Sequence, residues 1–214
     1  MIRDDAYLEI GGSHHVIVAA YTDTDVQPSH LGNTFFFWKA NGAISNQNVT
    51  LWKTDGTVAG TSQVSSTIFN SGNLEEFDNG ITFNGYYYFM GDNGTTTFSH
   101  LYRTDGNTVE TVKQFPTNTF ATGTKRMGTV FKNKLYFAAN VEITYPNTNV
   151  VYETELMESE GTSAGTKVLK NFRAGDDLEY FQANDRICFK KSDNLMLIKT
   201  WENTCTVYYT DGTV

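Results

Sequence analysis

The sequence predicts an all-β protein, and within that class a four-bladed β-propeller made of four-stranded repeats of about 50 residues. Three observations lead to this prediction. One seven-residue motif occurs four times, an aromatic cluster precedes each copy, and the composition suits strands and tight turns. Aromatic residues make up 14% of the 214 residues, and there are 18 Gly but only 3 Pro. A period of this length suits propeller blades better than helical solenoid units.

The motif reads Leu-Trp-Lys-Thr-Asp-Gly-Thr at residues 51–57 and recurs in varied form at 101–107, 156–162 and 207–213. Its acidic residues follow one another at intervals of 50, 55 and 51 positions. An acidic residue before glycine suits a turn, because glycine adopts positive φ without strain and the carboxylate accepts a hydrogen bond from the backbone two residues on. We therefore predict a structural role in turns for Asp55, Gly56, Asp105, Gly106, Glu160, Gly161, Asp211 and Gly212.

The residues after the motif differ between copies. A second glycine follows in Thr57-Val-Ala-Gly-Thr61 and in Thr162-Ser-Ala-Gly-Thr166. This pattern favours a wide hairpin loop closed by threonine hydroxyl groups. The second copy, from Asn107 to Thr111, lacks that glycine, so we expect a loop of different conformation there.

The aromatic cluster keeps nearly the same period as the motif, at intervals of 52, 48 and 52 positions between Phe37, Phe89, Phe137 and Phe189. Apolar residues occupy consecutive positions in the clusters, which indicates sheets covered on both faces, as propeller blades are. We expect four strands in each copy: the aromatic run, the motif strand, a strand after the glycine turn and a fourth before the next aromatic run. In the third copy these are residues 134–139, 152–158, 166–172 and 178–183.

A chain of this length can bury a self-sufficient core, so we predict one domain over residues 1–214. The segment before the first aromatic run aligns with the strands after the third motif. An N-terminal half-blade would therefore pair with a C-terminal half-blade and close the ring, which removes open sheet edges. The alternative is a larger array, in which the ends meet further repeats. The repeats are expected at 34–85, 86–133, 134–185, and 186–214 together with 13–33.

These repeats resemble the ELWxxDGT repeat family, whose units commonly read Glu-Leu-Trp-x-x-Asp-Gly-Thr-x-x-Gly-Thr. The match is best over residues 50–61 and 155–172, and Met157, Glu160 and Val207 depart from the pattern. The resemblance implies a propeller-like fold and an extracellular or cell-surface location in bacteria, often in adhesins. It implies no reaction and no functional residues. A virion appendage or a cytoplasmic location stays open, because the chain opens with carboxylates where a signal peptide carries an apolar run.

Charge and motif content argue against several classes of function. A net charge of −8 without a basic cluster disfavours a nucleic-acid partner. No run approaches the roughly 20 apolar residues of a membrane span. The neighbouring carboxylates Glu75 and Glu76 do not suit the separated acid and base of a glycosidase. The histidines lack the spacing of zinc ligands. We therefore expect a protein that is not an enzyme and needs no cofactor.

Two further features have alternative interpretations. Hard oxygen ligands in loops make calcium possible, at Asp23, Asp25, Asp92, Asn93, Asp176 and Asp177. The same residues cap turns in many proteins, and we favour that interpretation. Cys188 and Cys205 are expected on neighbouring strands of one repeat, where they either form a cross-strand disulfide or remain two buried thiols.

The leading hypothesis for function is a non-catalytic module that recognises a protein or glycan, or scaffolds a surface assembly, through loops at one end of the ring. The long loop of the third copy breaks the repeat pattern and offers Tyr145, Asn147 and Asn149. One alternative is a calcium-assisted lectin with a sugar site in each blade, at Trp52, Tyr102 and Tyr208, although we favour an interblade core for these side chains. Another alternative is a structural appendage protein of a virion, and a degenerate hydrolase is the least favoured.

Overall fold

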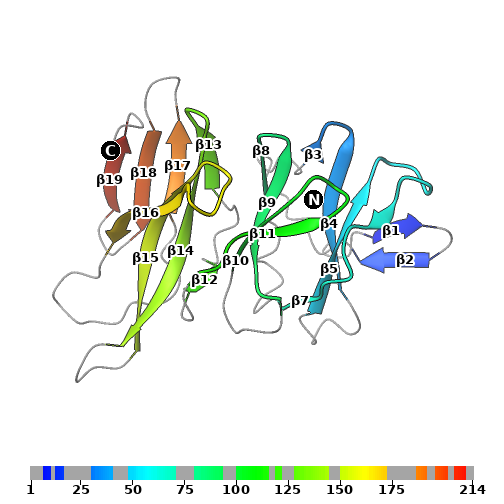
Figure 1. Ribbon diagram of the computed structural model, residues 1–214, viewed down its shortest axis with the longest axis horizontal. Coiled ribbons are helices and arrows are strands. Elements are labelled where there is room, and N and C mark those ends of the chain that lie inside the picture. The colour runs from blue at the N-terminus through cyan, green and yellow to red at the C-terminus, as the bar shows by residue number, and fades with distance from the viewer. Residues whose placement is uncertain are drawn as a thin grey trace.

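The computed structural model describes residues 7–10, 13–16, 30–40, 48–70, 80–93, 100–115, 119–121, 128–144, 150–172, 187–191, 196–201 and 205–210. Within these residues the protein is all-β, because every regular element is a strand and every strand pair is antiparallel. Figure 1 shows a two-stranded hairpin followed by four sheets, arranged in chain order along the longest axis of the molecule.

The sheets consist of consecutive strands. The N-terminal hairpin contains β1 (Tyr7–Ile10) and β2 (Ser13–Val16). The first sheet contains β3 (His30–Leu31), β4 (Thr34–Ala40), β5 (Asn48–Thr54), β6 (Ser62–Gln63) and β7 (Phe69–Asn70). The second sheet contains β8 (Ile81–Phe83), β9 (Tyr86–Gly91), β10 (His100–Thr104) and β11 (Val109–Lys113).

The third sheet is the one with the longest strands. It contains β12 (Thr119–Ala121), β13 (Gly128–Phe131), β14 (Lys134–Thr144), β15 (Val150–Ser159) and β16 (Thr166–Phe172). The fourth sheet contains β17 (Ile187–Lys191), β18 (Met196–Trp201) and β19 (Cys205–Thr210). Three of the strands expected in the third copy lie within β14, β15 and β16, and the fourth, at 178–183, lies outside the described residues.

The first three sheets each contain a short strand just before the aromatic strand, which was predicted to lie at the end of the preceding repeat. β8 pairs with the aromatic strand β9 through a two-residue turn at Asn84 and Gly85, whose φ values are 47° and 78°. β13 pairs with β14 through Lys132 and Asn133, at 45° and 57°. Two consecutive residues with positive φ form the turn that matches the twist of antiparallel strands. The expected order of strands is therefore shifted by one.

The same shift changes the interpretation of the fourth sheet. Its motif strand β19 pairs with β18, in the register of Ile198 with Tyr208, and β17 occupies the outer position that β8 has in the second sheet. Phe189, which the sequence analysis placed on the aromatic strand, lies on β17 instead. The strand equivalent to the aromatic strands is β18, which follows β17. The prediction chose Phe189 instead, because β18 carries Met196, Leu197 and Ile198 where the other copies carry aromatic residues.

The described strands form an open row rather than the expected closed ring. β2 pairs with β1, and β3 pairs with β4 of the first sheet, so neither of these N-terminal strands completes the fourth sheet. The N-terminal hairpin and β19 lie at opposite ends of the row in Figure 1. Pairing of the two half-blades is therefore not seen among the described residues, and residues 17–29 of the expected N-terminal half-blade lie outside them.

The core lies between neighbouring sheets and covers both faces of the second sheet. Tyr87 and Phe89 of β9 belong to one buried cluster together with Trp38, Leu51 and residues around them in the first sheet. The second cluster joins the opposite face of the second sheet to the third sheet, and it includes Tyr88, Leu101, Leu135, Phe137 and Met157. Because successive residues of a strand point to opposite faces, consecutive aromatic residues serve both interfaces. This confirms the prediction of two-sided burial for the second sheet.

Phe89 is at the centre of the first of these clusters. Its ring lies edge-on to Trp38 at a centroid distance of 5.1 Å and to Phe69 at 5.4 Å, and it stacks on Tyr102 at 5.5 Å. Aromatic pairs in these geometries add about 0.5–1.5 kcal/mol each beyond the area that they bury. The contacts with Trp38 and Phe69 join the second sheet to the first, so this ring is a central part of the interface between them.

We predict that Phe89→Ala lowers the free energy of unfolding by roughly 3–5 kcal/mol, since it removes a fully buried aromatic ring and leaves a cavity. Chemical denaturation measures the change. Phe35→Ala is the matched control, because Phe35 is 41% exposed, and it should cost about 1 kcal/mol or less. Similar losses in the two variants would contradict the assignment of Phe89 to the core.

Candidate functional site

The first copy of the motif forms a turn held together by its own side chains. Gly56 has φ of 90°, and its N–H donates to Thr54 Oγ1 at 3.0 Å. Asp55 Oδ1 accepts hydrogen bonds from the backbone N–H of Thr57 at 2.9 Å and from its hydroxyl at 2.7 Å. These bonds hold the pKa of the Asp55 carboxyl below its ordinary value. The loop closes through Thr54 Oγ1 and Thr61 Oγ1, which lie 2.7 Å apart.

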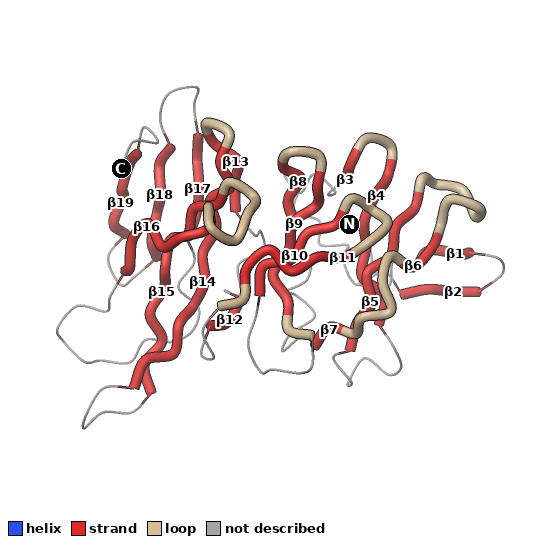
Figure 2. The backbone as a smooth tube through the Cα atoms, viewed as in Figure 1, coloured by secondary structure: helices blue, strands red, loops and turns tan. Residues whose placement is uncertain are grey.

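The third copy repeats the closing pair of hydroxyl groups, and the second copy differs from it. Ser159 Oγ and Thr166 Oγ1 lie 2.7 Å apart, in the same way as the threonine pair of the first copy. In the second copy Asp105 Oδ1 accepts from the N–H groups of Asn107 and Thr108, and β11 begins at Val109. The second turn is therefore shorter. Figure 2 shows the three turns in tan after β5, β10 and β15.

The turn of the second sheet packs against the first sheet. A Cβ atom built at Gly106 would lie 3.7 Å from both Phe36 Cζ and Lys53 Cδ, so the buried glycine fits closely against these two side chains. Lys53 Nζ donates to Asn107 Oδ1 at 3.3 Å. Phe36 and Lys53 are cross-strand partners on β4 and β5. This pair of side chains thus packs against the turn of the following sheet.

The turn of the third sheet packs on the second sheet in an equivalent way. The side chain of Tyr88 lies against Gly161, where a Cβ would be 2.5 Å from the tyrosine Oη. Its cross-strand partner Arg103 donates through Nη1 to the Gly161 carbonyl at 3.0 Å. Arg103 also pairs with Glu110 at 2.9 Å and lies over the Tyr86 ring, 4.2 Å from its centroid. The third motif position therefore provides the cation that contacts the next turn at both junctions.

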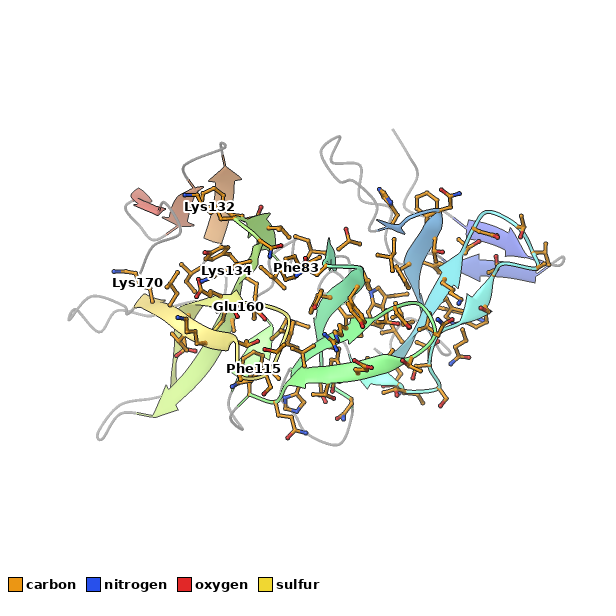
Figure 3. All side chains as sticks on the ribbon, turned by 45° about the horizontal axis from the view of Figure 1, so that its top comes forward. Phe83, Phe115, Lys132, Lys134, Glu160 and Lys170 are labelled. Carbon is orange, nitrogen blue, oxygen red and sulfur yellow. The ribbon has the colours of Figure 1, made fainter. Side chains whose placement is uncertain are left out.

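The third sheet has a carboxylate at this motif position, and the sequence analysis did not identify it. The side chain of Glu158 is only 3% exposed, and Oε1 accepts from Lys134 Nζ at 3.0 Å and from Lys167 Nζ at 3.3 Å. Burial raises the pKa of the Glu158 carboxyl, but the hydrogen bonds from the two lysines and from Tyr136 outweigh burial and lower it below 4.5. Lys134 also lies 4.0 Å from Glu160, and Figure 3 shows these two side chains side by side.

Tyr136 completes this polar cluster, because it is the cross-strand partner of Glu158. Burial first, and then the adjacent carboxylate, raise the pKa of the Tyr136 phenol to about 12, so the phenol stays protonated and donates to Glu158. The cluster spans β14, β15 and β16, and it bonds three strands through side chains in addition to the backbone. The signal in the sequence was the reversal of charge at the third motif position, where Lys53 and Arg103 precede Glu158.

The residues considered for repeated sugar sites have different environments. Tyr102 is 4% exposed and belongs to the core between the first and second sheets. Trp52 is half-buried, its Nε1 donates to Thr50 Oγ1 at 3.0 Å, and Lys39 Nζ lies 4.6 Å from the ring centroid. Tyr208 lies on β19, opposite Ile198 of β18. Tyr102 therefore presents no ring face to a sugar, and the three positions are not equivalent sites.

The residues of the predicted binding loop, Tyr145, Asn147 and Asn149, lie outside the described residues, but the strands on either side are described. β14 and β15 pair continuously from Leu135 with Ser159 to Thr144 with Val150. β12 pairs with β14 only as far as Val141, so among the described strands the last three residues of β14 pair with β15 alone. Figure 1 shows this hairpin projecting beyond the other strands of the row. The loop thus joins the ends of the longest hairpin in the described structure.

Among the described residues, no three acidic, histidine or cysteine side chains form a group that suits a metal ion. Of the calcium candidates, Asp92 and Asn93 are described at the end of β9, and Asp23, Asp25, Asp176 and Asp177 lie outside the described residues. His100 is a core residue, since its Nδ1 accepts from the Phe115 N–H at 3.1 Å, and burial lowers its pKa.

Cys188 and Cys205 are separated by β18. Cys188 pairs with Lys199 of β18, and Cys205 pairs with Trp201 on the other side of that strand. Two strand spacings amount to about 9.5 Å, whereas the Cα atoms of a disulfide lie at most about 7 Å apart. In this register the two cysteines are not cross-strand partners.

The described part of the chain contains no helix able to cross a membrane. No protein-family model, no curated protein and no solved structure matches this sequence. The interpretation of the site therefore depends on the contacts of this chain alone.

We predict that Arg103→Met lowers the free energy of unfolding by about 2 kcal/mol, because the bond from the guanidinium to the Gly161 carbonyl is charge-assisted and part-buried. Denaturant titration gives the value. Glu110→Gln is the matched control, since it removes only the ion pair on the exposed side of Arg103 and should cost about 0.5 kcal/mol or less. Equal effects would show that the contact between sheets contributes little.

The Glu158 cluster predicts a pH dependence of stability. The folded protein lowers the pKa of Glu158 below 4.5, so the stabilisation by its charge is complete above that pH and is lost as the pH falls through the folded value. Glu158→Gln should therefore be less stable than the wild type at neutral pH, because Lys134 and Lys167 lose their counter-ion, and the difference should shrink below pH 4.5.

Thermal unfolding between about pH 3 and pH 7 measures this difference. The control is Glu110→Gln, which removes an exposed carboxylate and should follow the wild-type pH profile closely. A constant difference between wild type and Glu158→Gln over this range would contradict the assigned role of the charge.

Proposed function

We propose that this protein is a non-catalytic module that recognises a protein or glycan partner in an extracellular or cell-surface assembly. The observation that carries the proposal is the hairpin of β14 and β15, which projects from the row of sheets and ends in the Tyr145–Asn149 loop. Binding residues are often found on loops that a rigid scaffold holds in place. The hairpin and the sheets beside it provide such a scaffold.

The use of the polar groups supports a scaffolding role for the repeats. The Asp, Thr and Ser side chains of the motifs bond their own turns, and Lys53 and Arg103 bond the turn of the next sheet. Their hydrogen-bonding capacity thus serves the fold. In this proposal the sheets are consecutive blades of a propeller-like array, as the resemblance to the ELWxxDGT repeat family implies, and that resemblance also supports the surface location.

A calcium-assisted lectin with one sugar site in each sheet receives less support. Tyr102 lies in the core, and Met157 at the equivalent position of the third sheet is also buried. A structural appendage of a virion agrees with the same sheets and turns, and it differs from the main proposal in the assembly that the module joins. The projecting hairpin of β14 and β15 favours recognition over a purely structural role.

The test is a glycan array probed with the purified protein, with calcium and with chelator, alongside Tyr145→Ala and Phe35→Ala. We expect Tyr145→Ala to lose selective binding with an unchanged melting temperature, and Phe35→Ala, an exposed aromatic residue of another sheet, to keep it. Binding that survives Tyr145→Ala would overturn the loop as the site. Dependence on calcium would favour the lectin alternative. Silence on every glycan would leave a protein partner, whose binding should show the same dependence on Tyr145.

A further inference from the structure

The first two of the three junctions between consecutive sheets share a rule of contact, and the turn at the third junction lies outside the described residues. A cross-strand pair on the preceding sheet, Phe36 with Lys53 or Tyr88 with Arg103, lies against the glycine of the following turn. The long polar side chain of the pair donates to that turn, at 3.3 Å in the first case and 3.0 Å in the second. Gly106 and Gly161 are buried as a result.

The glycine of the first turn has the same backbone conformation as Gly106 and Gly161, but it is exposed. Gly56 has φ of 90°, close to the 95° and 87° of Gly106 and Gly161. A Cβ atom at Gly56 would meet no described atom within 4 Å, and Val58 at the tip of the turn is 66% exposed. The part of the turn that is buried at the other two junctions is therefore preformed and accessible.

The fourth sheet offers the complementary pair. β18 and β19 place Leu197 opposite Tyr209, in the register positions that Phe36 and Lys53 have in the first sheet. Leucine is apolar like phenylalanine, and the tyrosine phenol is a hydrogen-bond donor like lysine. The fourth sheet lies at the far end of the row from the first sheet, so the two do not meet within one molecule (Figure 1).

We infer that the turn at residues 55–61 is a docking site for the fourth sheet of a second copy of this chain. The contact continues the rule of the first two junctions across a molecular boundary. It joins different surfaces of the two copies, and such head-to-tail contacts build either rings or open filaments. The inference goes beyond the proposed recognition of a partner, because it concerns how copies of the module assemble.

The test is sedimentation velocity of the full chain over a range of concentrations. We expect the wild type to self-associate and Val58→Glu to weaken the association at least about tenfold, because it places a carboxylate two residues from Gly56, at the edge of the proposed contact. Tyr209→Phe, on the other side of the contact, should weaken it in the same direction. Val168→Glu is the matched control, since Val168 is 45% exposed on β16 of the third sheet, and it should leave the association unchanged.

Three results would overturn the inference. A wild-type protein that stays monomeric at every soluble concentration would do so. A monomer with a radius of gyration near the roughly 17 Å of a compact domain, destabilised by Val58→Glu, would assign the turn to closure within one chain. Equal weakening by Val58→Glu and Val168→Glu would indicate non-specific association. Because Val58→Glu leaves the Tyr145 loop unchanged, ligand binding by this variant tests the proposed function separately.

Discussion

The contact between an acidic-glycine turn and the sheet before it is the constraint on which the rest of the described structure depends. A turn that packs on its own sheet would complete a hairpin and nothing more. Here the glycine leaves room for an aromatic ring of the neighbouring sheet, and its backbone conformation directs polar groups toward a lysine or arginine on that sheet. The same residues must therefore form the turn and pack against the neighbouring sheet. This explains why the motif includes both the end of a strand and a turn.

The core follows from the same arrangement. Sheets that pack face to face need apolar residues on both surfaces, and the aromatic strands meet this need by placing successive rings on opposite sides. The polar contacts between sheets lie at the turns, next to the buried aromatic rings. The Lys134, Glu158 and Lys167 cluster departs from the pattern, because it bonds the strands of one sheet to each other instead of reaching the next turn.

The sequence allowed the fold class, the turns and the two-sided burial to be predicted, because each depends on residues close together in the chain. Asp55 and Asp105 bond backbone groups two residues on, and two hydroxyl groups close each of the wide loops. The strand at which each repeat begins was harder to predict, because the spacing between motifs is the same whichever strand is taken as the first. Asn84 and Gly85 were the available signal, because that dipeptide favours the turn joining β8 to β9.

Two other features were not accessible from local pattern. The charge cluster at Glu158 forms through strand register, which brings Lys134 and Lys167 to one carboxylate from different strands. The expected ring rested on the alignment of N-terminal residues with the third copy, and alignment does not determine which edge a strand joins. β2 and β3 pair locally instead, as strands close in sequence most often do.

The polar residues that make the contacts between sheets differ from one sheet to the next. Lys53 donates to an asparagine side chain at the first junction, and Arg103 donates to a backbone carbonyl at the second. The third sheet has an ion-paired carboxylate, Glu158, where the others have a cation. Repeats with identical faces could exchange places or slip by one unit while folding. Here a sheet in the wrong place would bring a different donor, or the Glu158 carboxylate, to the turn. The contact residues therefore favour one order of the sheets.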